Sequence, residues 1–305
     1  MTVPSPRIHV LLPVHNRRAT TEKFIRCLLA QTHRNWRLIL IDDGSRDGTA
    51  EMARALVPEA TILSGAGKWW WAGALQQGLD RLIGDRVPAE DLVLIINDDT
   101  EFGPDFLANA AAAVRPNSLL LARAYRLATG EFSEVGVYWD WRKLICTPVK
   151  DGGEVNCFST RGLFLTFGDF VRIGGFHTRM LPHYLSDYEF TLRAHRKGFA
   201  LISDERVVLH YDEALTGLRD IEDRSMWQRM LADFSIRSAG NPVYWTSFVL
   251  LASPLRYVPL NIVRVWAGFF TPVRVRIRAT LIVPGRIFLG KVKRKTIKLW
   301  TTGQW

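Results

Sequence analysis

The fold of this chain is decided by the stretch Leu40-Ile41-Asp42-Asp43-Gly44-Ser45-Arg46-Asp47-Gly48-Thr49. An apolar strand runs directly into two adjacent acids, a glycine-rich turn and the start of a helix. A turn with Asp47 as the helix N-cap accounts for Asp47 and for the glycines. It does not account for two adjacent acids at a strand end. In open α/β sheets ligands bind outside the carboxyl ends of the strands, so we predict that Asp42 and Asp43 face a ligand.

The same alternation of strand and helix continues on both sides of this stretch. We expect strands at residues 8–12, 37–41, 61–63 and 92–96, and helices at 20–30, 48–56, 72–83 and 104–114. Near-continuous apolar strands separated by helices are typical of a mostly parallel sheet covered on both faces. From 115 to 176 the alternation is lost, as expected for mixed strands and acceptor-side loops. A helix at 185–197 and a strand at 206–210 follow.

Polar side chains also follow the first and the fourth strand. Pro13-Val14-His15-Asn16 comes after the first strand, and Asn97-Asp98-Asp99 comes after the fourth. Carboxylates at the end of a buried strand repel one another unless a cation or hydrogen-bond donors neutralise them. Mg²⁺ or Mn²⁺ takes oxygen ligands and bridges to a diphosphate. The alternative is a polar turn before the helix at 104.

The composition is that of an ordinary globular protein. The 305 residues are 48% hydrophobic and 23% charged, which is enough apolar mass for a full core. Three scattered cysteines, Cys27, Cys146 and Cys157, have neither metal-ligand nor redox spacing and favour a reducing compartment. Residues 1–6 are short and polar and do not resemble a signal peptide. We therefore expect a cytoplasmic protein.

The net charge of +10 is confined to the C-terminal quarter. Phe234 to Trp305 contains twelve Lys and Arg residues and no acid. A neutral body with a basic, Trp- and Leu-rich tail favours an anionic membrane surface over nucleic acid. The uncharged run between Arg237 and Arg256 is interrupted by glycine and prolines, which fits interfacial helices better than a span. The alternatives are a helical cap on the catalytic domain or an oligomer contact.

Three motifs together carry a resemblance to a known family. They are Val10-Leu11-Leu12-Pro13-Val14-His15-Asn16-Arg17, Cys27-Leu28-Leu29-Ala30-Gln31-Thr32 and the stretch 40–49. With Asn97-Asp98-Asp99, Gly174-Gly175-Phe176 and the segment 186–193, residues 7–212 resemble family 2 glycosyltransferases, which are inverting enzymes with the GT-A fold. The resemblance implies a catalytic domain at 1–233, with a nucleotide-sugar half at 7–115 and an acceptor half at 116–233. The tail is 234–305.

The resemblance also implies roles for individual residues. The nucleotide sugar would be held by a set drawn from the strand ends and the loops beside them: Pro13, Val14, His15, Asn16, Arg17, Asp42, Asp43, Lys68, Trp71, Gly73, Asn97 and Asp98. Asp99 would bind Mg²⁺ or Mn²⁺, and His210 would complete the metal site. Asp187 would deprotonate the acceptor hydroxyl, in an enzyme of the hexosyl- or deoxyhexosyltransferase class. The acceptor is expected to be a lipid-linked or cell-surface glycan.

The chain departs from the family pattern at two positions. Asn97 stands where the family carries the first Asp of its Asp-X-Asp metal motif, which leaves metal binding to Asp99. Ser186 stands where an acid often precedes the catalytic Asp. Ser186 and Glu189 also fit a capping box, in which Asp187 would only complement the helix dipole. In that arrangement Glu189 caps the helix and has Arg193 as its i,i+4 partner, so Asp187 is the preferred base.

Three further features have functional and structural interpretations. Trp69-Trp70-Trp71 cannot all face one core, so we expect at least one indole to line a cleft, where it could stack on a sugar. A packing cluster under a loop is the alternative. His210 and the weaker candidate His183 are either ligands or structural histidines. Arg161 is a weaker candidate for contact with the donor phosphates.

Two other functions compete with the glycosyltransferase. A sugar-nucleotide nucleotidyltransferase would need a Gly-rich, Arg-containing phosphate loop after the first strand, where this chain has Pro-Val-His-Asn-Arg. A catalytically inactive membrane-bound scaffold would not need Asp43, Asp99 and Asp187 together. Donor hydrolysis would discriminate between the enzyme and the scaffold.

Overall fold

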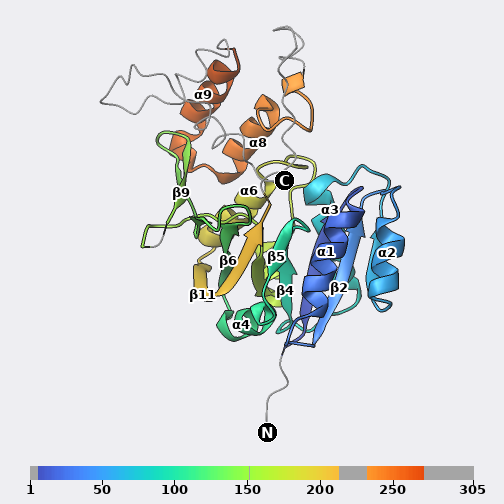
Figure 1. Cartoon of the computed structure of the whole chain (residues 1–305). Helices are drawn as coiled ribbons and strands as arrows, with labels where there is room; N and C mark the ends of the chain where they lie inside the picture. The colour runs from blue at the N-terminus through green and yellow to red at the C-terminus, as the bar shows by residue number, and fades with distance from the viewer. Residues whose placement is uncertain (1–5, 151, 213–231, 271–305) are drawn as a thin grey trace.

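The computed structural model describes residues 6–150, 152–212 and 232–270. The first half has the expected alternation (Figure 1). Its strands and helices are β1 (Ile8–Val14), α1 (Arg18–Leu29), β2 (Trp36–Asp42), α2 (Thr49–Leu56), β3 (Thr61–Ser64), α3 (Trp70–Gly84), β4 (Leu92–Ile95), β5 (Thr100–Phe102) and α4 (Phe106–Ala113). All eight expected elements of this half are present, with ends that differ by no more than a few residues.

The second half supplies the mixed strands and the acceptor-side helices. Its elements are β6 (Ser118–Arg126), β7 (Phe132–Glu134), β8 (Gly136–Asp140), β9 (Ile145–Val149), β10 (Leu163–Thr166), α5 (Phe167–Ile173), α6 (Ser186–Arg196) and β11 (Ala200–Tyr211). The tail contributes α8 (Pro242–Ala252), η2 (Leu255–Tyr257) and α9 (Val258–Phe270). The strand expected at 206–210 is longer and begins at Ala200.

One large sheet brings the strand ends together. Its order is β3-β2-β1-β4-β10-β6-β11-β5, and β7 pairs with β6. β1 to β4 are parallel, whereas β10 is antiparallel to both β4 and β6. Pro13 pairs with Ile41 and Val14 pairs with Asp42. The polar segments that follow β1, β2 and β4 therefore meet at one edge of the sheet, as the sequence predicts.

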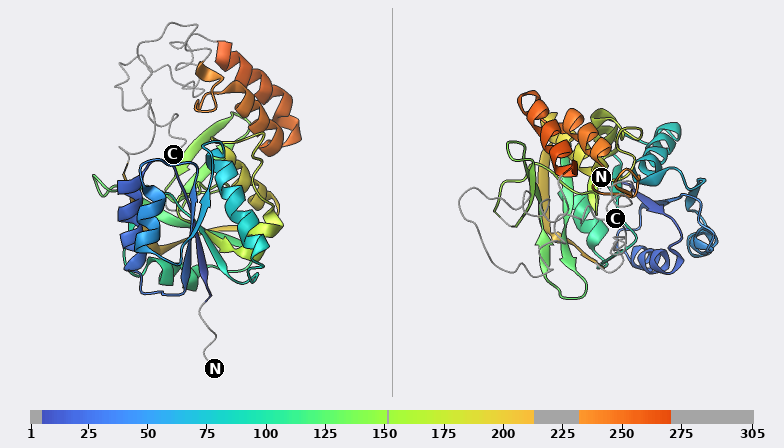
Figure 2. Two further views of the ribbon diagram at one scale, coloured as in Figure 1. Left: turned by 90° about the vertical axis from the view of Figure 1, so that its right-hand side faces the viewer. Right: turned by 90° about the horizontal axis from the view of Figure 1, so that it is seen from above.

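Helices cover both faces of this sheet (Figure 2). Alternate strand residues face opposite sides, so Val10 and Leu12 pack in one hydrophobic cluster and Leu11 packs in the other. α1, α2 and α4 cover the first face, and α3, α5 and α6 cover the second. Burial on both faces explains why the strands are almost continuously apolar.

The described part of the tail packs on β8 and the segment that follows it. Phe248 of α8 is fully buried, and its ring centroid lies 4.9 Å from that of Trp139 and 5.5 Å from that of Trp141. The amide of Asn261 in α9 donates to the Trp141 carbonyl at 2.9 Å. Figure 1 shows α8 and α9 at the end of the molecule opposite the N-terminus. β1 and β2 run toward this end. Residues 242–270 thus form a helical cap at the carboxyl end of the parallel strands.

None of the helices within the described ranges is long and apolar enough to cross a membrane. Several large apolar side chains of α8, η2 and α9 nevertheless face solvent. They are Val243, Leu250, Leu255, Leu260, Val263 and Phe270. Three of the twelve tail cations, Arg237, Arg256 and Arg264, lie within the described residues, and the other nine lie at 271–305, outside them.

Candidate active site

Asp43 is engaged by the backbone in front of α3. One carboxylate oxygen accepts the amides of Gly67 and Lys68 and the other accepts those of Trp69 and Trp70, at 2.8 to 3.1 Å. Negative charge at a helix N-terminus also complements the helix dipole. Both oxygens of Asp43 are therefore used in holding this loop, which gives Asp43 a structural role.

Asp42 retains an oxygen for a ligand. Its Oδ1 accepts the Ser45 amide at 2.7 Å, and its Oδ2 receives no hydrogen bond from the residues that the structure describes. The side chain is buried, with 5% of its surface exposed. A carboxylate oxygen at a strand end that accepts no hydrogen bond within the described residues is suited to accept one from a nucleoside.

The loops after β1 and β2 are locked together by hydrogen bonds. His15 donates from Nδ1 to the Asp43 carbonyl at 2.7 Å, so its Nε2 is free to accept from the Asn16 side chain at 3.0 Å. The Asn16 side-chain oxygen accepts the Arg46 amide, and the Asn16 amide donates to Ser45 Oγ, both at 2.8 Å. Asn16 has a φ of 52°, a left-handed conformation that asparagine tolerates. These residues fix the edge beside Asp42.

Asp98 joins the end of β4 to the start of α1. Arg17 Nε lies 2.8 Å from its Oδ1, and the Thr21 hydroxyl donates to its Oδ2 at 2.9 Å. Burial raises the pKa of Asp98 to about 6, although Arg17 and Thr21 both oppose this shift. Arg17 and Asp98 therefore reach the predicted edge as a pair that ties two elements together.

Asp99 has the properties expected of a metal ligand. It is buried, with 6% of its surface exposed, and its Oδ1 has no hydrogen-bond partner among the described residues. Its Oδ2 lies 3.8 Å from Arg17 Nη2. An unsatisfied buried carboxylate oxygen is costly unless a cation or a donor meets it. Asn97, beside it, is also buried and accepts the Thr100 hydroxyl on its carbonyl at 2.7 Å.

His210 lies on β11, opposite the second residue after Asp99 on the neighbouring strand β5. It pairs with Glu101, and its ring centroid is 5.8 Å from that of Tyr125. The backbone amide of Asp212, not His210, donates to the Asp99 carbonyl, at 3.2 Å. Across the described ranges, no three His, Cys, Asp or Glu side chains form a group that could hold a metal ion. A cation bound by Asp99 would need most of its ligands from the substrate and water.

Asp187 lies in the first turn of α6, but the predicted capping box is wrong. Leu185, with φ 67°, is the N-cap, and no side chain caps the helix. The Ser186 hydroxyl instead donates to the His183 carbonyl at 2.7 Å. Burial raises the pKa of Asp187 to about 6, and the backbone amides of Tyr188 and Asp187 lower it, as does the charge of Arg161. Such a carboxylate is ionised at neutral pH and basic enough to take a proton.

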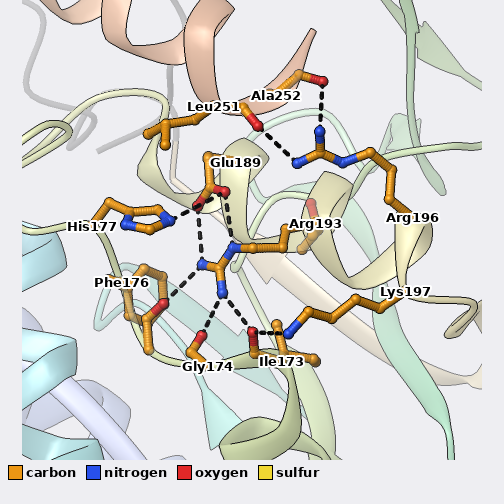
Figure 3. Close-up of polar contacts among 12 residues, drawn as sticks. Ile173, Gly174, Phe176, His177, Glu189, Arg193, Arg196, Lys197, Leu251 and Ala252 are labelled. Atoms are coloured by element: carbon orange, nitrogen blue, oxygen red, sulfur yellow. Dashed lines mark hydrogen bonds and ion pairs between the residues drawn. The ribbon is translucent and has the colours of Figure 1, made fainter. Parts of the chain in front are cut away.

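Glu189 is bonded to Arg193, as its i,i+4 spacing predicts. The guanidinium and the carboxylate meet through two contacts, at 2.9 and 3.0 Å. Figure 3 shows Arg193 between Glu189 and the backbone carbonyls of the 173–175 segment, to which it donates. His177 approaches Glu189 Oε1 at 3.7 Å. Glu189 therefore fastens α6 to the glycine-rich turn, and its carboxylate is used in binding Arg193.

The three tryptophans have different surroundings. Trp71 is buried in the core, with 4% of its surface exposed, whereas Trp69 and Trp70 are partly exposed. Trp70 has a φ of 55° and packs edge-on against His183 with ring centroids 5.4 Å apart. Both exposed indoles line a cavity of about 300 Å³, together with Lys68, Gly73 and Gln76. Trp70, rather than the predicted Trp71, is thus accessible to a ligand.

Two acidic residues near Asp99 and Asp187, namely Glu134 and Asp212, were not predicted from the sequence. Glu134 ends the three-residue strand β7, and burial raises its pKa to about 7, a shift that the charge of Arg161 opposes and that of Asp187 reinforces. Asp212 follows β11 and contacts the backbone of Asp99. Neither residue belongs to a recognisable motif, because their positions depend on how β7 and β11 pair in the sheet.

Comparisons with known proteins agree with this geometry. The sequence model of glycosyl transferase family 2 matches residues 9–133. A Bacillus subtilis (strain 168) protein that carries the name glycosyltransferase EpsE is 28% identical over 241 residues, which cover 77% of this chain and 80% of that protein. The family model thus spans the strand ends that carry Asp42 and Asp99.

Two solved structures share the fold. One is the mannosyltransferase PcManGT from Pyrobaculum calidifontis in complex with GDP-Man and Mn²⁺ (TM-score 0.52, 17% identity, 90% of this chain and 73% of that chain). The other is S. aureus TarS (TM-score 0.55, 13% identity, 86% of this chain and 54% of that chain). The GT-A fold predicted from the sequence is confirmed. The family match over residues 9–133, the relative and this fold together support a glycosyltransferase of family 2 that acts on nucleotide sugars.

Proposed function

We propose that this glycosyltransferase is a metal-dependent, inverting enzyme that transfers its sugar to a hydroxyl of a lipid-linked or cell-surface glycan. One observation carries the proposal. The Asp99 carboxylate, with a buried oxygen that has no partner among the described residues, follows β4, and the Asp187 carboxylate, with its raised pKa, begins α6, a helix that packs on the same sheet. The Asp99 carboxylate is suited to bind a metal cation, and the Asp187 carboxylate is suited to accept a proton.

Mg²⁺ or Mn²⁺ fits the environment of Asp99. Mg²⁺ is usually bound through one or two carboxylates together with substrate phosphates and water, which agrees with the lack of a three-ligand group among the described residues. Asp99 would hold the cation, and Asp212 is a nearer second candidate than His210 because its amide contacts the Asp99 backbone. When bound, the cation supplies positive charge to the leaving diphosphate. The mannosyltransferase with a similar fold was solved with GDP-Man and Mn²⁺.

The nucleoside would be held at the edge formed by the β1 and β2 loops. Asp42 has the available oxygen, whereas both oxygens of Asp43 are occupied by the backbone before α3. We therefore assign contact with the base or ribose to Asp42, with His15 and Asn16 fixing the loop beside it. Lys68 and Gly73 would lie toward the sugar, where they line the cavity with Trp70.

The chemistry requires a base and a leaving group on opposite sides of the sugar. Asp187 takes the proton of the acceptor hydroxyl as its oxygen forms a bond to the anomeric carbon. The bond from that carbon to the phosphate oxygen breaks, and the nucleoside diphosphate leaves with the electron pair. Attack opposite the leaving group inverts the configuration at the anomeric carbon.

The position of the helical cap supports an acceptor held at a membrane. α8 and α9 lie at the end of the molecule toward which the parallel strands run (Figures 1 and 2), and they expose apolar side chains such as Leu255, which is 87% exposed. Anionic headgroups attract nearby Lys and Arg residues. Peripheral binding on the cytoplasmic face would thus bring the site close to an acceptor in the bilayer.

Replacement of Asp99 tests this function most directly. We expect Asp99→Ala to fold and to lose the Mn²⁺-dependent thermal shift that a nucleoside diphosphate produces in the wild type, along with transfer activity. Asp204→Ala is the matched control, because Asp204 is a carboxylate on β11 that pairs only with Arg206 at the surface. Full activity of the wild type in excess EDTA would refute the metal dependence.

A further inference from the structure

Arg161 is a buried cation whose donors are unused. Only 4% of its surface is exposed, and its guanidinium carbon lies 4.0 Å from the centre of the Tyr211 ring. Within the part of the chain that the structure describes, none of its three side-chain nitrogens, Nε, Nη1 and Nη2, has a hydrogen-bond partner. Burying a charged group without hydrogen-bond partners destabilises a fold, whereas an exposed charge is solvated by water. The burial of Arg161 therefore needs an explanation.

Arg193, a partly buried arginine on α6, shows what a structural role looks like. Arg193 makes two contacts with Glu189 and donates to the carbonyls of Ile173, Gly174 and Gly175. Its charge and its donors are satisfied inside the fold (Figure 3). Among the described residues, Arg161 has neither an ion-paired carboxylate nor a carbonyl to which it donates. Packing against Tyr211 holds its guanidinium in place but satisfies none of its five N–H groups.

Two chain connections place Arg161 beside the catalytic edge. The next residue, Gly162, donates its amide to the Ile95 carbonyl at 3.1 Å, at the end of β4. Tyr211, on which Arg161 stacks, immediately precedes Asp212, whose amide contacts Asp99. Gly162 has a φ of 78°, and a Cβ there would come within 2.5 Å of the Leu209 side chain. Glycine is thus required at this turn, and the turn fixes where the Arg161 side chain starts.

The positive charge of Arg161 is close enough to the proposed base, Asp187, to lower its pKa. The same charge opposes the effect of burial on the pKa of Asp187 and on that of Glu134. No hydrogen bond joins the guanidinium to either carboxylate within the described residues. The guanidinium is therefore close to Asp187, and its neighbours Gly162 and Tyr211 connect it to the segments that end at Asp99 and Asp212. In the proposed function the reacting part of the sugar nucleotide binds between Asp99 and Asp187.

We propose that Arg161 is the oxyanion-binding residue of this active site and that its guanidinium binds an anionic group of the sugar nucleotide. The proposal rests on the proposed function, since it requires the donor to bind between Asp99 and Asp187. Two parts of a donor carry suitable oxygens: the diphosphate and, in a uronic acid sugar, the carboxylate. A planar guanidinium binds both kinds of oxyanion with two parallel hydrogen bonds.

The test compares Arg161→Gln and Arg161→Lys with the wild type. Arg206→Gln is the matched control, since it removes one positive charge from an exposed position of β11. UDP, GDP and dTDP are titrated calorimetrically with Mn²⁺, each beside its own nucleoside, and the pair that the wild type binds best is used. A second arm compares nucleotide-hexose with nucleotide-uronate donors that share this base.

Binding to the diphosphate predicts that Arg161→Gln weakens nucleoside diphosphate affinity by about 10- to 100-fold and leaves nucleoside affinity unchanged. Arg161→Lys keeps the positive charge but lacks the planar guanidinium that donates two parallel hydrogen bonds, so an intermediate affinity is expected. Binding to a sugar carboxylate predicts instead that Arg161→Gln weakens only the uronate donor. Either result supports the proposal and identifies the source of the oxyanion.

Equal affinity of wild type and Arg161→Gln for every ligand would overturn the proposal. So would a lower melting temperature of ligand-free Arg161→Gln and Arg161→Lys with unchanged binding, because that is the pattern of a structural residue. If the wild type binds no nucleoside diphosphate at all, the proposed function fails as well. If Asp99→Ala loses Mn²⁺-dependent binding while Arg161→Gln keeps it, only the role of Arg161 fails.

Discussion

Asp187→Asn separates catalysis from folding more clearly than any other substitution in this chain. The amide has almost the size of the carboxylate but cannot accept a proton from the acceptor hydroxyl. Loss of a general base lowers the rate by about 10²- to 10⁴-fold, and we expect kcat to fall within that range. Donor affinity should stay within a few-fold, because Asp42 and Asp99, not Asp187, are assigned to the donor.

The pH dependence follows from the raised pKa of Asp187, which is about 6. Roughly nine tenths of the carboxylates are ionised at pH 7 and roughly one tenth at pH 5, by the usual titration relation. Since the ionised form is the base, kcat/KM of the wild type should fall about tenfold between these pH values. The residual activity of Asp187→Asn should lack this acidic limb.

Stability should change in the opposite direction to activity. The pKa of Asp187 is about 6 in the folded protein, against an ordinary value of 3.8, so the folded chain holds this proton more tightly than the unfolded chain. The resulting stabilisation is complete below pH 3.8 and is lost as pH rises to about 6. Above pH 6 the buried charge costs up to about 3 kcal/mol, at 1.36 kcal/mol per pKa unit. Asp187→Asn removes that cost and should unfold at a higher temperature than the wild type at pH 8.

Single-turnover kinetics with a saturating donor and thermal unfolding at pH 5 and pH 8 measure both effects. Glu189→Gln is the informative comparison, because the buried Glu189 pairs with the partly buried Arg193 and its loss should lower the melting temperature. An active Asp187→Asn beside a well-folded but inactive Glu189→Gln would refute the assignment of the base. Loss of the fold in Asp187→Asn would refute the stability argument.

Two further predictions follow from the loop and the tail. Asp43→Ala leaves four backbone amides without their acceptor. We expect the free energy of unfolding, measured by urea denaturation, to fall by about 2 to 4 kcal/mol. A fall no greater than that of the control Asp80→Ala, at an exposed position, would contradict the structural role of Asp43. Truncation after Phe270 removes nine of the twelve tail cations but keeps Phe248 and Asn261 packed; it should reduce co-sedimentation with anionic vesicles at low salt and preserve donor binding. Sedimentation that is equal for both lengths, for anionic and neutral lipid and at low and high salt, would contradict electrostatic membrane binding.

Sequence alone was sufficient for the features that depend on local pattern. The apolar runs around Val10, Ile39 and Leu94 predicted buried parallel strands, and the acids after them predicted one ligand-binding edge. The pairing of Glu189 with Arg193 followed from helical spacing, because side chains four residues apart lie on the same face of a helix. Family membership likewise rested on the order and spacing of short motifs.

Tertiary structure decided which polar groups are available. Asp42 and Asp43 are equivalent by sequence, yet only the folded chain brings four amides to Asp43 and leaves an oxygen of Asp42 without a partner. Trp71, not Trp70, is buried because α3 turns that face toward the sheet. Arg161 could be ranked only after its surroundings were known, since the availability of a guanidinium depends on partners that are distant in sequence. Hydrogen-bond satisfaction is a property of the whole fold, whereas strand and helix periodicity is a property of neighbouring residues.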